Sequence, residues 1–284
     1  MSIDIDHLKE WIGRTELVSD EVTRTPLAAL SATLDRDDPP PRPGDPVPPL
    51  WHWLYFLPVS RQSEIGPDGH AKLGSFLPPV PLPRRMYAGG RLQFIQALRV
   101  GELISRTSRI VDVSLKEGRT GALVFVLVRH EISNRIGPAV AEEHDIVYRN
   151  LPGPSDPAPK PQNAPTDADW TLEIHPDAVL LFRYSALTFN GFRIHYDYKY
   201  TTEVEKYPGL VVHGPLIATL LVDLVRRNLP DASVESFSFR AMKPLFDVEP
   251  FWICGKAERG ARTVKLWAKD AEGFLAMDAT AALA

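Results

Sequence analysis

The architecture follows from residues 182–227, FRYSALTFNGFRIHYDYKYTTEVEKYPGLVVHGPLIATLLVDLVRR. The first part, residues 184–197, predicts a polar loop that carries Asn190 and His195 five residues apart. The second part predicts a helix over residues 215–227, because apolar residues recur there at spacings of three and four. The stretch therefore predicts a loop bearing polar side chains that leads into an apolar helix.

The start of that helix has the features of a site for a developing oxyanion. Pro215 suits the first helical position, because its missing N–H would have no partner there. The N–H of Gly214 lies at the positive end of the helix dipole and can donate to an oxygen that becomes negative. His195 in the preceding loop is a natural proton carrier. Together they predict a site that polarises a carbonyl while a proton moves at a neighbouring carbon.

Asn190, His195 and the sequence His213-Gly214-Pro215 resemble the signature of the MaoC-like hydratases/dehydratases of the hotdog superfamily. The sequences SALTFNGFRIHYD and YPGLVVHGPL are most similar to the branch of type 2 hydroxyacyl-thioester dehydratases and 3-methylfumaryl-CoA (mesaconyl-CoA) hydratases. The resemblance extends to the first half, where PPVPLPRRMYAGGR is typical of this branch. Two positions depart from the usual patterns. Most MaoC-like enzymes have Asp where Asn190 stands, and this branch often has His where Phe192 stands.

The resemblance implies an acyl-CoA hydratase/dehydratase that adds or removes water across the α,β double bond of an enoyl thioester. The implied substrate is mesaconyl-CoA-like, or another branched or dicarboxylic enoyl-CoA. His195 would be the acid/base and Asn190 would hold the water, since an amide cannot titrate. Gly214, His213 and Tyr207 would form the oxyanion and substrate site. The implied enzyme needs no metal and no cofactor beyond the coenzyme A of its substrate.

Several alternatives stay open. A carboxylate from Asp197, or from outside the motif, could complete the acid/base chemistry. The chain could be an (R)-3-hydroxyacyl-thioester dehydratase of fatty acid metabolism. It could also be a non-catalytic acyl-CoA-binding hotdog protein, for which Asn190 and Phe192 are the motivating features, or a thioesterase of the same fold. Asn190 before Gly191 could be an ordinary turn former.

Three arginines, Arg84, Arg85 and Arg91, precede or open a helix predicted over residues 86–98. Coenzyme A carries phosphates, so this cluster is a candidate CoA-binding site, with a solvated basic patch as the alternative. His52, between two tryptophans, predicts a structural hydrogen-bonding group.

Proline-rich residues 151–169 predict a linker between residues 1–150 and residues 170–284. Each side shows a helix followed by strands, which predicts an α+β double hotdog, two antiparallel sheets that each wrap a helix. The resemblance implies chemistry in the second unit and accommodation of the acyl group in the first. The predicted helices cover residues 4–13, 21–34, 86–98 and 215–227, and the predicted strands cover residues 103–115, 121–132, 141–148, 170–174, 180–184, 234–242, 251–258, 262–269 and 275–282.

Composition limits the classes of function. The 284 residues carry a formal net charge of −4, which argues against a nucleic-acid partner. No apolar run is long enough to span a membrane, and the N-terminus lacks a signal-peptide pattern, so a cytoplasmic enzyme is expected. The single cysteine, Cys254, rules out an internal disulfide and is expected to be buried. The expected partner is an acyl-CoA or acyl-thioester substrate, and a homodimer of double hotdogs is a possibility.

Overall fold

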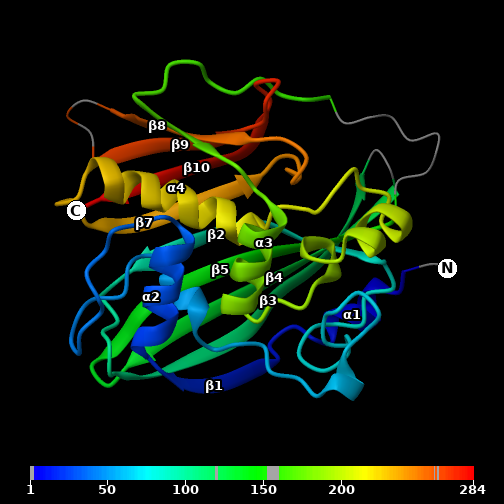
Figure 1. Cartoon of the computed structure of the whole chain (residues 1–284). Helices are drawn as coiled ribbons and strands as arrows, with labels where there is room; N and C mark the ends of the chain where they lie inside the picture. Colours follow the sequence, from blue (N-terminus) through cyan, green and yellow to red (C-terminus); the bar gives the residue numbers. More distant parts are fainter. Residues whose placement is uncertain (1–2, 119–120, 152–159, 259, 261) are drawn as a thin grey trace.

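The structure is a computed structural model that describes the chain except residues 1–2, 119–120, 152–159, 259 and 261. Its strands form one antiparallel sheet in the order β1-β3-β4-β5-β2-β7-β10-β9-β8-β6 (Figure 1). The first half supplies β1 (Thr15–Glu21), β2 (Arg84–Phe94), β3 (Leu103–Gly118), β4 (Gly121–Asn134) and β5 (Gly137–Arg149). The second half supplies β6 (Trp170–Ile174), β7 (Val234–Ala241), β8 (Phe251–Ala257), β9 (Thr263–Lys269) and β10 (Leu275–Leu283).

Each half places one helix against its part of the sheet (Figure 1). In the second half this is α4 (Gly214–Asn228), in which residues 216–225 are all buried and which packs on β8, β9 and β10. In the first half it is α2 (Arg24–Thr33), whose Leu27 and Leu30 belong to the same apolar core as Leu221 of α4. The expected α+β double hotdog is confirmed. The remaining helical segments are α1 (Ile5–Lys9), α3 (Ala178–Leu187), the 3₁₀ turns η1 (Trp51–Leu54), η2 (Gln62–Glu64) and η3 (Arg193–His195), and the π-helical turn η4 (Tyr200–Val204).

The two halves meet where β2 pairs with β7. A Cβ atom at Gly89 would lie 2.6 Å from the carbonyl oxygen of Phe239, so only glycine lets the two backbones approach this closely. The helix predicted over residues 86–98 is therefore wrong. Gly89 and Gly90 instead mark a close contact between strands at the centre of the sheet. The helix that the first half places against the sheet is α2, which lies within the helix predicted over residues 21–34.

Two other predictions failed for local reasons. Residues 180–184 were expected to be a strand but lie in α3, where the side chain of Asp177 caps the helix by accepting from Leu180 N at 2.8 Å. The polar loop consequently starts after Leu187, later than predicted. β1 was not predicted at all, because its burial is confined to one partly covered face.

The other predicted strands are present, and Cys254 is buried as expected. His52 is also confirmed as a structural hydrogen-bonding group, because its Nε2 lies 3.0 Å from Glu142 Oε2. Residues 152–159 of the proline-rich segment lie outside the described residues. Within the described part of the chain, no helix is long and apolar enough to cross a membrane.

Candidate functional site

His195 lies in η3, on the loop between α3 and α4, and only 7% of it is exposed. Its Nδ1 is 2.7 Å from the carbonyl oxygen of Val211. Because a carbonyl oxygen can only accept, Nδ1 carries the hydrogen, and this assignment leaves a lone pair on Nε2 in the neutral ring. Burial lowers the pKa of His195 to about 4, although the hydrogen bond to Val211 opposes the shift. The imidazole is therefore neutral near pH 7, with Nε2 able to accept a proton.

His213, the residue before α4, holds His195 in place. The two rings stack with centroids 3.7 Å apart and planes at 17°. His213 is fully buried, and its Nε2 lies 2.8 Å from Ser185 Oγ on α3. Burial, and then the neighbouring His195, keep the pKa of His213 well below its usual range. This arrangement suits an orienting residue better than a second base.

Gly214 is the first residue of α4. Among the described residues no group accepts a hydrogen bond from its N–H. A Cβ atom built on Gly214 would have the carbonyl oxygen of Tyr87 as its nearest neighbour, at 4.0 Å. There is thus room for a ligand beside Gly214, and its N–H has no acceptor within the described part of the chain, as an oxyanion donor requires.

Asn190 closes a local turn, because its side-chain Oδ1 accepts from Phe192 N at 3.0 Å. The alternative carboxylate, Asp197, is already engaged. It accepts from Arg193 Nε and Nη2 at 3.0 and 2.7 Å and from Tyr200 N at 3.0 Å. Asp197 consequently stabilises the loop, and its oxygens are committed to these donors.

A third histidine, His70, was missed from the sequence. Its ring centroid lies 4.2 Å from that of Phe192, and its Nδ1 is 2.8 Å from Asp68 Oδ2. The backbone N–H of Arg193 donates to Asp68 O at 2.9 Å, so this segment is joined to the His195 loop. Burial lowers the pKa of His70 to about 4. The only sequence signal was the spacing Asp-Gly-His, which by itself predicts a turn.

The remaining predicted residues, Tyr207 and the three arginines, have partners of their own. Arg84 pairs with Glu205 at 3.1 Å and lies over the ring of Tyr207, 4.4 Å from its centroid. Arg91 pairs with two surface carboxylates, Glu143 and Asp145. Arg85 lines a cavity of about 260 Å³ together with His70, Lys72 and Tyr148. All three arginines lie on β2 rather than at a helix start.

No three His, Cys, Asp or Glu side chains within the described ranges are grouped so that they could hold a metal ion. The chemical groups that these residues offer are a buried neutral imidazole with a free Nε2 and a backbone N–H without an acceptor at the start of α4.

Comparisons with known proteins identify the family and the fold. The family model of hydroxyacyl-thioester dehydratase type 2 matches residues 50–247. The chain is 46% identical to the mesaconyl-C(4)-CoA hydratase of Chloroflexus aurantiacus, over 96% of each chain. A MaoC-like dehydratase from Phytophthora capsici has the same fold with a TM-score of 0.69 and 12% identity, covering 99% of this chain and 98% of its own. A double-hotdog protein of Mycobacterium tuberculosis matches with a TM-score of 0.59 and 13% identity, over 96% of each chain. The chain belongs to the family of type 2 hydroxyacyl-thioester dehydratases and is a hydro-lyase of acyl thioesters.

Proposed function

We propose that the protein hydrates a short branched or dicarboxylic enoyl-CoA of the mesaconyl-CoA type at the site formed by His195 and Gly214. The substrate class is supported by the 46% identity to a mesaconyl-C(4)-CoA hydratase over nearly the whole chain. The observation that best supports this site is the hydrogen bond from His195 Nδ1 to Val211 O, because it leaves Nε2 free next to the start of α4.

The proposed reaction needs one proton carrier and one oxyanion donor. His195 Nε2 takes a proton from water, and the water oxygen bonds to the β-carbon. The electron pair of the double bond moves through the α-carbon to the thioester oxygen, which accepts a hydrogen bond from Gly214 N–H. The enolate then collapses, and its α-carbon takes the proton from His195. The reverse sequence removes water from a 3-hydroxyacyl thioester.

Asn190 has a supporting role in this proposal. Its Oδ1 is engaged with Phe192 N, so the amide hydrogens of Nδ2 are the groups left to hold the attacking water. His213 fixes the ring of His195, and Tyr207 closes the site beside Arg84. Of the three arginines on β2, Arg85 is the best candidate for a coenzyme A phosphate, because it lines a cavity beside His70.

The test is a panel of CoA thioesters with wild-type protein and His195→Ala. Wild type is expected to hydrate mesaconyl- and crotonyl-CoA. The variant should lose roughly 10²–10⁴-fold in rate, as removal of an acid/base group does. His175→Ala is the matched control, because that side chain is 76% exposed and its ion pair is with Glu173 at the surface.

The panel also separates the alternatives. Faster turnover of saturated long-chain 3-hydroxyacyl thioesters would favour the fatty-acid dehydratase. Release of free CoA would favour a thioesterase. Tight binding without turnover would make the protein a non-catalytic acyl-CoA binder and would contradict the proposal.

A further inference from the structure

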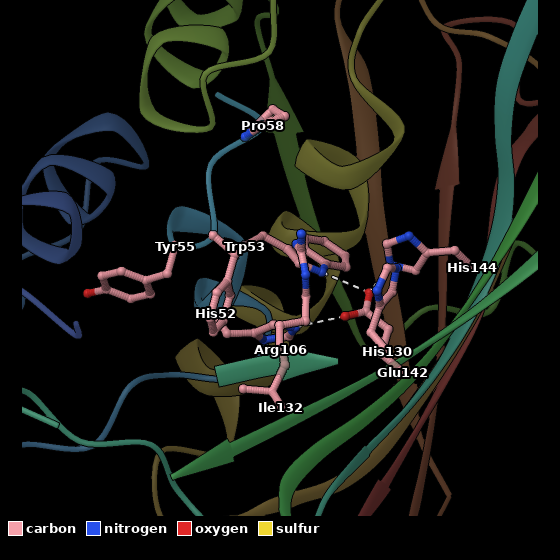
Figure 2. A pocket seen from close by; sticks show the side chains of 10 residues that line it. His52, Trp53, Tyr55, Pro58, Arg106, His130, Ile132, Glu142 and His144 are labelled. Atoms are coloured by element: carbon pink, nitrogen blue, oxygen red, sulfur yellow. Dashed lines mark hydrogen bonds and ion pairs between the residues drawn. The ribbon is translucent and has the colours of Figure 1, made fainter. Parts of the chain in front are cut away.

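Two cavities in the described part of the protein lie in its first half, and the one that His70 lines adjoins the His195 loop. The cavity shown in Figure 2, of about 200 Å³, surrounds Glu142, whose Oε2 is already engaged with His52 Nε2 at 3.0 Å. The cavity at His70 has a volume of about 260 Å³. The ring of His70 connects the wall of this cavity to the His195 loop, because it packs against Phe192 of that loop.

Residues 64–72 of the first half form a small hairpin, the His70 hairpin. Ile65 and Ala71 pair in it as an antiparallel bridge. Within its turn, Asp68 Oδ1 accepts from His70 N at 3.1 Å, and Asp68 Oδ2 lies 2.8 Å from His70 Nδ1. The orientation of the His70 ring is therefore set by residues of the first half.

Backbone contacts dock the His70 hairpin on the His195 loop. Gly69 has a φ of +95°, and a Cβ atom built there would lie 1.8 Å from the carbonyl oxygen of Gly191, so only glycine allows this approach. Arg193 N donates to Asp68 O at 2.9 Å, and Arg193 Nη1 donates to another carbonyl oxygen of the hairpin at 2.9 Å. Gly191 and Arg193 flank Phe192 in the sequence. The hairpin therefore holds the loop on both sides of Phe192.

Phe192 connects the docked hairpin to His195. The ring centroids of His70 and Phe192 lie 4.2 Å apart with planes at 40°. Phe192 in turn meets His195 edge to face, with centroids 5.6 Å apart and planes at 89°. Phe192 also packs against the apolar cluster that contains Val211, whose carbonyl oxygen accepts from His195 Nδ1. A shift of Phe192 would consequently disturb both the ring of His195 and the acceptor that sets its tautomer.

We propose that His70 is a positioning residue for His195 that acts through Phe192, so that the first half of the chain completes the site of the second half. The inference rests on the proposed function, in which His195 is the acid/base. His70 itself neither touches the substrate nor carries a proton in this account. Its ring holds Phe192, and Phe192 holds the imidazole of His195 at the orientation that the reaction needs.

The surroundings of His70 favour an effect on the loop over an effect on the core. The side chain of His70 is 22% exposed and lines a cavity, so its removal leaves no sealed void in the core. Burial lowers the pKa of His70 to about 4, so the ring is uncharged near pH 7. An uncharged ring packs against Phe192 without the cost of desolvating a charge.

The experiment compares three variants of His70 with wild type on mesaconyl- and crotonyl-CoA. His70→Ala removes the ring, and we expect kcat to fall roughly 10–10²-fold at an unchanged KM, as misplacement of a catalytic group does. His70→Phe keeps a ring against Phe192 and should recover most of kcat. His70→Asn keeps a polar group beside Asp68 without the ring and should be as slow as His70→Ala. Gln62→Ala is the matched control, because Gln62 is an exposed residue of the neighbouring turn η2.

A second pair of variants tests the docking of the hairpin without changing His70. Gly69→Ala and Gly101→Ala both place a Cβ atom at a positive φ, +95° and +91°. At Gly101 this atom meets nothing within 4 Å, whereas at Gly69 it meets the backbone of Gly191. We expect kcat to fall for Gly69→Ala, roughly as for His70→Ala, and to stay at the wild-type value for Gly101→Ala.

NMR of the histidine ring nitrogens tests the inference independently of turnover. In wild type, His195 is expected to carry its hydrogen on Nδ1 alone. In His70→Ala the signals should show both tautomers, and the pKa of His195 should rise from about 4 toward its ordinary value. If wild type turns over no thioester, the proposed function fails, and this comparison still decides the inference.

Three results would overturn the positioning role. The first is a wild-type kcat, or an unchanged His195 signal, in His70→Ala. The second is a His70→Phe variant as slow as His70→Ala, since His70 would then act through its own nitrogens and not through Phe192. The third is an equal loss of kcat in Gln62→Ala or in Gly101→Ala. If His70→Ala does not fold, the comparison of His70→Phe with His70→Asn decides in its place.

Discussion

In the proposed site, a single hydrogen bond determines which nitrogen of His195 can act. Val211 O accepts from His195 Nδ1 at 2.7 Å and so determines which nitrogen of the ring is free. His213 stacks on the same ring, and Ser185 holds His213. A histidine fixed in this way loses little entropy when it accepts a proton from a bound water.

The low pKa of His195 predicts an unusual pH profile. The base must be neutral, so kcat/KM should fall only as the pH drops through about 4, and not near 6.5. Stability should behave differently. Between pH 6.5 and 4 the unfolded chain binds a proton on this residue and the folded protein does not, so the free energy of unfolding decreases as the pH falls. Initial rates and urea unfolding between pH 7 and 5 test both expectations. A fall in kcat/KM centred near 6.5 would contradict the buried, neutral assignment of His195.

Residues close in sequence could be predicted, and residues brought together by folding could not. Asn190, His195 and Gly214 share one continuous stretch, and the resemblance of that stretch to the family signature selected them as candidates. His70 comes from a distant segment, and nothing within a few residues of it distinguishes it from a surface side chain. Its proximity to the site depends on loop packing, which has no local pattern.

The helix α4 combines packing with function. Its buried side holds it against β8, β9 and β10, and its first N–H is the proposed oxyanion donor. Asp223, 2% exposed, is bound by Arg227 Nε at 2.7 Å and by Arg36 Nη1 at 2.5 Å. Arg36 follows α2, so this pairing connects α4 to the segment after the helix of the first half. The start of α4 is thereby fixed relative to both halves.

Gly214→Ala tests the role of the helix start. The new Cβ would meet no protein atom closer than 4.0 Å, so the melting temperature should not change. The methyl group would, however, occupy the space proposed for the thioester. Turnover should therefore fall roughly 10²–10³-fold, a loss like that of one oxyanion donor. Normal hydration of crotonyl- and mesaconyl-CoA by this variant would mean that the helix start has only a packing role.

The elements that were predicted wrongly have physical reasons. Residues 86–98 contain apolar residues at mixed spacings, so the pattern did not exclude a helix, whereas the contact of Gly89 with Phe239 requires a strand. α3 is an apolar run that matches a buried strand as well as a helix, and its cap at Asp177 was the overlooked signal. By contrast α4 is long and strongly periodic, and it was predicted to within one residue at each end.

The two halves behave as one body because β2 and β7 join them into a single sheet. The pairing places the ring of Tyr87 on β2 against the ring of Phe239 on β7, with ring centroids 5.4 Å apart. The proposed site and the cavity around Glu142 are both built next to this junction. The relative position of the halves therefore determines the shape of the proposed site.

Gly89→Val tests this junction. Its Cβ would lie 2.6 Å from Phe239 O, so β2 and β7 must move apart. We expect a loss of about 1–3 kcal/mol in the free energy of unfolding, as for other overpacked sites, measured by urea denaturation. Gly214→Ala is the control, since a Cβ there is accommodated. A wild-type unfolding curve for Gly89→Val would mean that the junction relaxes easily.

The most direct test of the site is a structure of the protein with butyryl-CoA, a saturated thioester that cannot be hydrated. The thioester oxygen is expected at hydrogen-bond distance from Gly214 N, about 2.7–3.2 Å, with the β-carbon on the side of His195 Nε2. A thioester oxygen far from Gly214, or a β-carbon that faces away from His195, would contradict the assignment of the site.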